Sequence, residues 1–176
     1  MHFTPSRLRH FALESRMFKI PPTLNFKSPA TLLATWFGCG LMRPGPGTWG
    51  SIGALPFGIF FLVWGSPFLL ALAAIALFFI GIWATKRVLA GSGDDSDPQI
   101  VVIDEVVGQW IALIPAAFNP VSLLLALILF RVFDVLKPWP VSYFDQKIPG
   151  AWGVMLDDVA AGILAALCLW GIQLWL

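Results

Sequence analysis

The stretch PFLLALAAIALFFIGIWAT, residues 67–85, contains no charged side chain and decides the fold class. Its length is close to the ~20 residues that an α-helix needs to cross the hydrocarbon core of a bilayer. The whole chain has the same character, since 58% of its 176 residues are hydrophobic and 12% are charged, with a mean hydropathy of +0.81. A soluble domain carries roughly 25% charged residues. The sequence therefore predicts an all-α fold, a polytopic membrane helical bundle.

Four further apolar runs flank this stretch, at about residues 30–41, 52–64, 106–136 and 153–176. Asn119-Pro120 interrupts the third of them, which predicts a hairpin of two helices there. The run 30–41 is short and glycine-terminated, so we expect it at the interface or as a re-entrant piece. We therefore expect about four to five membrane-embedded helices in one domain, residues 30–176.

Residues 1–29 differ from the rest because they are basic and contain proline. Apolar side chains such as Leu8 and Phe11 among the arginines would suit a helix lying on anionic lipid. A disordered tail is the alternative. No apolar region follows at the distance typical of a signal peptide, so we expect a cytoplasmic basic arm with an interfacial segment.

The charged residues predict how the chain is threaded. All of them lie in residues 1–43, 86–105 or 131–158, and the connections at 65–67 and 119–120 carry none. With the basic N-terminus inside, every charge falls on the cytoplasmic side or in its half of the helices. The positive-inside rule accounts for the lysines and arginines. It does not require the acids to cluster there, so their clustering predicts an active site facing the cytoplasm.

Two adjacent pairs of acids enter apolar helices, Asp104-Glu105 and Asp157-Asp158. One such pair is explained by the favourable interaction of acids with a helix N-terminus. Two pairs on the same side of a membrane indicate a divalent-cation site with hard oxygen ligands. No histidine or cysteine ligand is nearby, so magnesium or manganese fits better than zinc.

Arg131, Asp134 and Lys137 follow one another at three-residue spacing, which places successive members close on one helix face. One interpretation is a self-neutralising ladder at a helix end, with a snorkelling lysine. The other is a pair of cationic phosphate contacts beside a carboxylate, which is either a metal ligand or the general base of a water.

The Gly/Pro-rich segment PGPGTWGS, residues 44–51, precedes the first spanning run. Gly47 lets backbone N–H groups approach an anion, and Thr48 is a candidate cap at a helix N-terminus that favours phosphate. In the polar loop ahead of residue 100, Asp97 is the acid best placed to add a metal ligand. A solvated loop is the simpler interpretation of its neighbours, Asp94 and Asp95.

Together these motifs resemble the phosphatidylglycerophosphatase A family over about residues 30–172. The resemblance lies in PGTWGS (46–51), DP (97–98) with IVVIDEVVG (100–108), FRVFD (130–134) through KPWP (137–140), and Gly153 with Asp157-Asp158 and Ala161-Gly162. One departure is Met42-Arg43-Pro44-Gly45, where family members more often have a serine-proline step displaced by one position from Pro44.

The resemblance implies a magnesium-dependent phosphatase of the bacterial inner membrane that converts phosphatidylglycerophosphate, a membrane phospholipid, into phosphatidylglycerol and inorganic phosphate. Residues 30–176 then form a membrane-embedded phosphatase domain. The expected catalytic residues are Asp104, Glu105, Asp134 and Asp158. The expected metal ligands are Asp104, Glu105, Asp157, Asp158 and Asp97, with Mg²⁺ as cofactor. The expected phosphate contacts are Thr48, Gly47, Arg131 and Lys137.

Other classes of protein fit the sequence less well. Both histidines, His2 and His10, precede every apolar run, which excludes a histidine-nucleophile lipid phosphatase. Cys39 and Arg43 are too close for a cysteine phosphatase loop. A net charge of +1 without a basic stripe excludes a nucleic-acid partner. A CDP-alcohol phosphatidyltransferase-like enzyme and a divalent-cation transporter remain alternatives, although the transferase signature is absent and the far side of the membrane is uncharged. The oligomeric state stays open.

Overall fold

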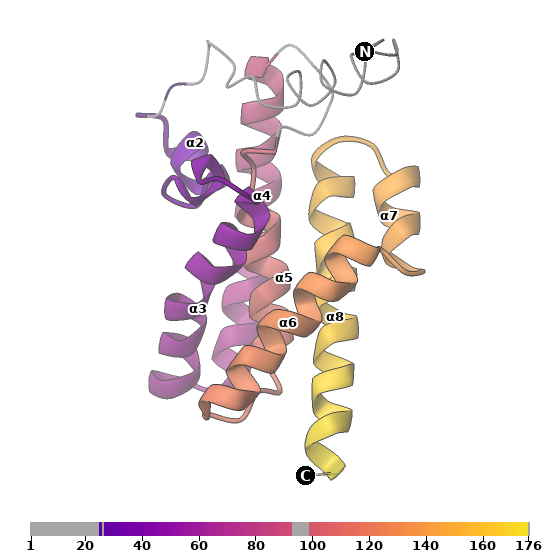
Figure 1. Ribbon diagram of the computed structural model, residues 1–176. Coiled ribbons are helices and arrows are strands. Elements are labelled where there is room, and N and C mark those ends of the chain that lie inside the picture. Colours follow the sequence, from indigo (N-terminus) through magenta and orange to yellow (C-terminus); the bar gives the residue numbers. More distant parts are fainter. Residues whose placement is uncertain (1–24, 26, 93–98, 176) are drawn as a thin grey trace, which may run out of the picture.

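The computed structural model describes residues 25, 27–92 and 99–175. Most of the expected N-terminal arm and the loop residue Asp97 lie outside these ranges, so the predictions made for them remain predictions. The described part is helical without a strand, which confirms the all-α class (Figure 1). Its elements are α2 (Pro29–Ala34), η1 (Cys39–Leu41), α3 (Pro46–Trp64), α4 (Pro67–Ser92), α5 (Ile103–Leu113), α6 (Pro120–Leu136), α7 (Val141–Lys147) and α8 (Gly150–Trp175).

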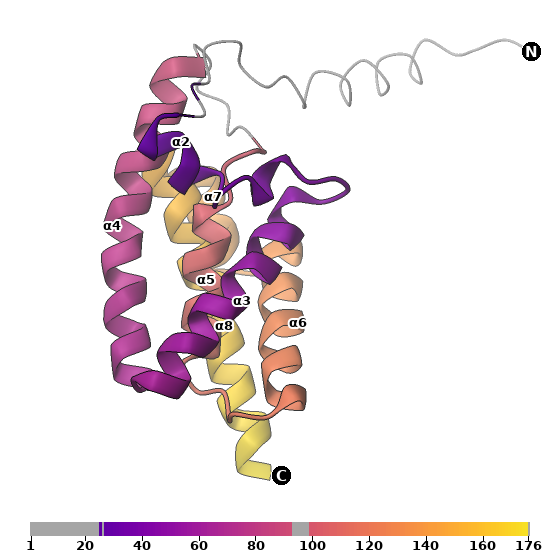
Figure 2. The same ribbon diagram turned by 90° about the vertical axis from the view of Figure 1, so that its left-hand side faces the viewer.

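Helices α3, α4, α5, α6 and α8 run side by side, with α5 in the middle of the bundle (Figures 1 and 2). α5 contacts each of the other four. The short helices α2 and α7 lie at one end of the bundle, and the α3–α4 and α5–α6 connections lie at the other. The end that carries α2 and α7 is called the polar end below, because the charged side chains gather there.

Proline and asparagine explain where several helices begin. α2, α3, α4 and α6 each start with proline, whose fixed φ suits the first turn and whose missing N–H is not needed there. Asn119 caps α6, since its Oδ1 accepts a hydrogen bond of 2.9 Å from the backbone N–H of Ser122. The hairpin that Asn119-Pro120 predicts is therefore confirmed.

Among the described residues, α3, α4 and α8 are long and apolar enough to cross a membrane, so the structure has three such helices rather than four to five. α6 has 17 residues. α5 has 11 residues, and nine of these are buried. The apolar character of α5 therefore serves contacts inside the bundle rather than contact with lipid. α7 was not predicted, because residues 141–147 are short and contain no continuous apolar run.

α5 and α8 approach one another most closely where both carry glycine. A Cβ atom added to Gly162 would lie 2.4 Å from the backbone oxygen of Gly108, and one added to Gly108 would lie 2.4 Å from Cε2 of Phe130. Small residues at such a crossing let two helix backbones come together in a membrane protein. No larger side chain fits at either position without moving the helices apart.

We predict that Gly162→Ala lowers the free energy of unfolding by about 1–3 kcal/mol, because the added methyl group overpacks the crossing. The measurement is the thermal unfolding midpoint in detergent. Gly171→Ala is the matched control on the same helix, since a Cβ there meets nothing within 4 Å. Equal midpoints for the two variants would contradict the tight crossing.

Candidate active site

Asp104 and Glu105 occupy the first turn of α5, at the polar end of the bundle. The start of this helix is anchored by the backbone N–H of Val102, which donates a hydrogen bond of 2.8 Å to the carbonyl of Ala34 in α2. Residues 100–103 are buried, so the approach to α5 is fixed by packing as well. The two carboxylates therefore stand on a rigid support.

Asp158 of α8 joins these two acids. One carboxylate oxygen from each of Asp104, Glu105 and Asp158 lies within 4.8 Å of the others. The glycine crossing explains this meeting, because Gly108 follows Asp104 by four residues and Gly162 follows Asp158 by four. Residues at this spacing share one helix face. Helices that touch at the two glycines therefore bring the two aspartates together one turn nearer the polar end.

The three carboxylates, called the acidic cluster below, are largely withdrawn from water. Asp104 is 7% exposed and Asp158 is 3% exposed. Oε2 of Glu105 and Oδ2 of Asp158 are buried and have no hydrogen-bond partner within the described part of the chain. Buried like charges repel and are costly without compensation. A divalent cation with oxygen ligands would supply that compensation, so the donor set fits a magnesium ion.

Arg131 of α6 lies against this cluster. Its Nη1 is 2.6 Å from Oδ2 of Asp134 and 4.0 Å from Oε1 of Glu105. The contact with Asp134 is an ion pair without hydrogen-bond alignment, and Nη1 is buried without a hydrogen-bond partner among the described residues. Asp134 also lies near Asp158. The guanidinium is thus held in place by charge and keeps donors for an anion.

Gly47, in the first turn of α3, completes the wall opposite Arg131. A Cβ added to it would lie 2.1 Å from Oε1 of Glu105 and 3.0 Å from Nη1 of Arg131. Only a glycine allows the α3 backbone to come this close to both side chains. The N-terminus of α3 therefore lies beside Glu105 and Arg131, and the phosphate contact predicted for Gly47 remains a prediction.

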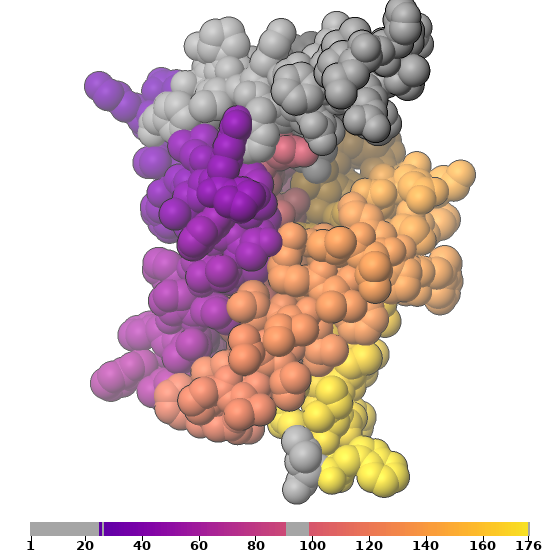
Figure 3. Space-filling model, viewed as in Figure 1, coloured from indigo at the N-terminus to yellow at the C-terminus, as the bar shows by residue number. Residues whose placement is uncertain are grey.

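One cleft of about 560 Å³ at the starts of α3 and α5 is lined by Gly47, Asp104, Glu105 and Arg131, whereas Asp134 and Asp158 are not part of its lining. Its walls also include residues 43–46, Gln99 and Val101. On the face shown in Figure 3, the surface of α3 and its preceding loop meets that of α6 along a seam. Arg43 thus lines the cleft, although the sequence marked it only as a departure from a family motif.

Lys137 and Asp157 form a second group beside the cluster. Nζ of Lys137 is 2.8 Å from Oδ2 of Asp157 and is also paired with Asp145 of α7. Oδ1 of Asp157 accepts a hydrogen bond of 3.0 Å from the backbone N–H of Asp158. Asp157 is therefore engaged by these neighbours and is not one of the three carboxylates of the cluster.

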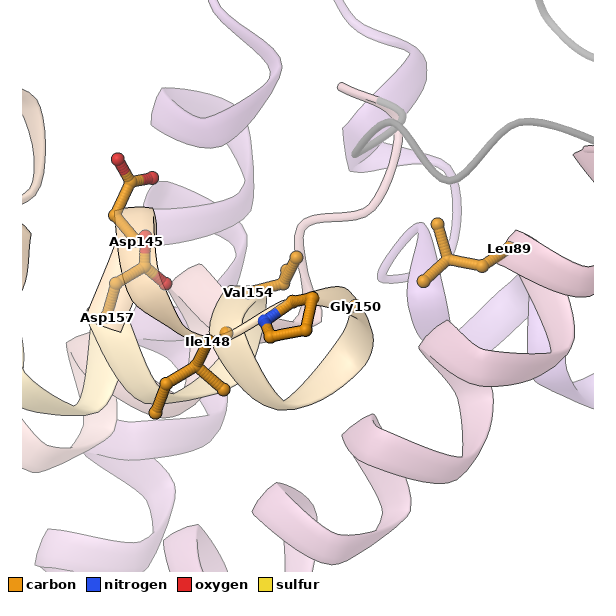
Figure 4. A pocket seen from close by; sticks show the side chains of 8 residues that line it. Leu89, Asp145, Ile148, Gly150, Val154 and Asp157 are labelled. Atoms are coloured by element: carbon orange, nitrogen blue, oxygen red, sulfur yellow. The ribbon is translucent and has the colours of Figure 1, made fainter. Parts of the chain in front are cut away.

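Burial alone would lower the pKa of Lys137, but its hydrogen bonds to Asp145 and Asp157 and the charges of these acids outweigh it, so the pKa is raised above its usual range. Lys137 therefore stays a cation. Asp145 and Asp157 line a pocket of about 240 Å³ together with residues such as Ile148, Gly150 and Val154 (Figure 4). Sequence reasoning missed Asp145, because it stands on the unpredicted helix α7.

Two further expected site residues are not part of the cluster or of the cleft lining. Lys137 follows the end of α6 in a left-handed conformation, φ 44°, and pairs with Asp145 and Asp157. Thr48 is exposed and is not part of the cleft lining. The roles predicted for these two residues remain predictions, as does that of Asp97.

The family model of phosphatidylglycerophosphatase A matches residues 32–173. The chain belongs to the phosphatidylglycerophosphatase A family. It is 39% identical to the phosphatidylglycerophosphatase A of Haemophilus influenzae, over 87% of this chain and 94% of the relative. It is 36% identical to that of Escherichia coli, over 81% and 83% respectively. It is also 37% identical to a proposed phosphatidylinositol-3-phosphatase of Bacteroides thetaiotaomicron, over 79% and 92%. No solved structure matches.

We predict that Gly47→Ala lowers kcat by at least about tenfold, because the added methyl group displaces Glu105 and Arg131 from positions where small shifts are costly. Phosphate release from the lipid substrate measures this loss. The same substitution at Gly171, far from the cleft, should leave kcat unchanged. A fully active Gly47→Ala variant would show that the closeness of α3 to Glu105 does not matter for the reaction.

Proposed function

We propose that this protein hydrolyses phosphatidylglycerophosphate to phosphatidylglycerol and inorganic phosphate, with Mg²⁺ held by its acidic cluster, at the cytoplasmic face of the bacterial inner membrane. The family match over most of the chain supports the activity and the substrate. The observation that carries the proposed mechanism is the meeting of Asp104, Glu105 and Asp158 behind a cleft that Asp104, Glu105 and Arg131 line.

The reaction joins the oxygen of a water molecule to phosphorus and breaks the ester P–O bond. One proton of the water passes to a base, and the departing glycerol oxygen takes up a proton to give the alcohol. Phosphate monoesters hydrolyse very slowly without catalysis, and their charge spreads over the phosphoryl oxygens in the transition state. The site must therefore supply positive charge and an oriented water.

The residues of the chain divide these tasks. Arg131 binds the phosphoryl oxygens through the donors that Asp134 leaves available, while Asp134 fixes its orientation. The α3 backbone at Gly47 brings a helix N-terminus to the same place. Asp134 is also the candidate base for the water proton. A magnesium ion held by Asp104, Glu105 and Asp158 would withdraw charge from the phosphoryl group and lower the pKa of a bound water.

Lipid hydrolysis at a membrane surface fits the distribution of charge in the bundle. The cleft lies at the polar end, whereas the opposite end carries the uncharged polar residues Asn119, Ser122 and Gln173. A phospholipid could therefore keep its acyl chains in the bilayer while its headgroup enters the cleft. The positive-inside rule supports the proposed position of this end in the cytoplasm.

We predict that phosphate release requires Mg²⁺, is abolished by EDTA and is restored by added Mg²⁺. Asp158→Asn should lower kcat by at least about 100-fold, because it removes a charged ligand from a preorganised site. Asp145→Asn removes a carboxylate outside the cluster and should cost far less. Full activity of purified wild type in EDTA would rule out the metal mechanism.

The proposed orientation predicts which positions a membrane-impermeant maleimide reaches. In a variant without Cys39 and Cys168, Ser66→Cys in the α3–α4 connection should react from the periplasmic side in intact spheroplasts. Ser142→Cys in α7 should react only after the membrane is permeabilised. The reverse pattern would place the cleft on the outer face.

A further inference from the structure

Gln109 is the polar side chain of α5 that neither the fold nor the proposed mechanism uses. It is 0% exposed, in the middle of the bundle. Both Oε1 and Nε2 of its amide are buried and have no hydrogen-bond partner among the residues that the structure describes. An unsatisfied buried polar group destabilises a folded protein, because it has lost its hydrogen bonds to water. An apolar side chain of the same length would pack here without this cost, so packing does not explain a glutamine.

The position of Gln109 connects it to the acidic cluster. It follows Glu105 by four residues, so the two side chains share one face of α5, with Cβ atoms roughly 5–6 Å apart. Helical side chains tilt toward the N-terminus, so the Gln109 amide is directed toward the turn that carries Glu105. Oε2 of Glu105 is itself buried without a hydrogen-bond partner among the described residues.

Two groups with unused hydrogen-bonding capacity thus stand one turn apart without bonding to each other. The carboxylate only accepts, whereas the amide offers both a donor and an acceptor. A small molecule between them that donates and accepts would satisfy both, and water is the molecule of this kind that the hydrolysis consumes. A neutral amide also adds no further negative charge beside three carboxylates.

We propose that Gln109, which lies one turn of α5 deeper than the cleft lining, holds the attacking water beneath the acidic cluster. Oε1 accepts a hydrogen bond from one O–H of the water and so orients the oxygen lone pair toward phosphorus. The proton of the other O–H passes to Asp134, the candidate base named above, as the new O–P bond forms, the ester P–O bond breaks and the departing glycerol oxygen takes up a proton. Gln109 keeps its own protons throughout. The inference rests on the hydrolytic function proposed above and adds the residue that positions its nucleophile.

The test is Gln109→Met, which keeps the length of the side chain and removes both polar atoms. We expect kcat to fall by about 100-fold, the scale of losing one preorganised hydrogen bond in a transition state. KM for phosphatidylglycerophosphate should stay within about threefold, because the water does not hold the ground-state substrate. Inhibition by orthovanadate, whose apical oxygen occupies the place of the attacking water, should weaken by a factor close to that of kcat/KM.

Stability separates this role from a structural one. The thermal midpoint of Gln109→Met should equal or exceed that of wild type, because an unsatisfied amide has been removed. Gln173→Met is the matched control at the far end of the bundle, where the amide donates a hydrogen bond of 3.0 Å to Oγ of Ser122. That variant should melt earlier and keep its kcat.

The inference is overturned if Gln109→Met keeps kcat within about threefold of wild type. It is also overturned if kcat falls together with the midpoint while vanadate binds as before. If Gln109→Met does not fold, Gln109→Asn keeps the amide and shortens the side chain, and full activity of that variant would equally contradict the proposal. Wild type in the same preparation reports separately on the proposed function, since only its failure to release phosphate would contradict the hydrolysis itself.

Discussion

The contact between α5 and α8 at Gly108 and Gly162 determines the geometry of the site. With the backbone oxygen of one glycine 2.4 Å from where a Cβ of the other would stand, the two helices are as close as their backbones allow. Association of helices in lipid depends on such packing, because burial of apolar surface gives little advantage there. Asp104 and Asp158 precede these glycines by one turn each, so the packing that holds the bundle also forces two acids together. The chemistry thus depends on an interaction that involves no charged atom.

This arrangement stores an electrostatic cost that the surrounding residues only partly offset. Arg131 and Lys137 each approach the acids, but Arg131 is shared with Asp134 and Lys137 is engaged by Asp145 and Asp157. When all three are ionised, the carboxylates of the cluster therefore leave an excess of negative charge in a buried place. Such an excess favours binding of a cation and, with it, an anionic phosphate. The buried acids lower the stability of the bundle while they serve the proposed function of the site. The same holds for the buried amide of Gln109.

Much of this site was predictable from sequence, because charge is rare in a membrane protein and its placement is informative. The pairs Asp104-Glu105 and Asp157-Asp158, together with Arg131, pointed to one end of the bundle before any contact was known. The sequence could not separate Asp157 from Asp158, since adjacent residues on a helix point about 100° apart and only packing decides which faces α5. It also predicted Lys137 on the face of Arg131. In the structure α6 ends at Leu136, one residue before Lys137. The backbone of Lys137 is left-handed, and its side chain is directed toward α7. α7 itself carries no apolar period long enough to be recognised.

Helix length explains how one element can both cross the membrane and deliver an acid of the proposed site. α8 has 26 residues, or about 39 Å of helix, against a hydrocarbon core of ~30 Å. Roughly 9 Å of α8 is therefore available to the headgroup region. Asp158 stands eight residues after Gly150, about 12 Å from the start of the helix, and so falls near the boundary of the hydrocarbon. α5 begins its first turn at the same level, although it is far too short to span the bilayer alone. Because α5 is short and buried, Asp104 and Glu105 in its first turn lie at the same depth as Asp158. A lipid phosphate can reach these acids there while its acyl chains stay in the membrane.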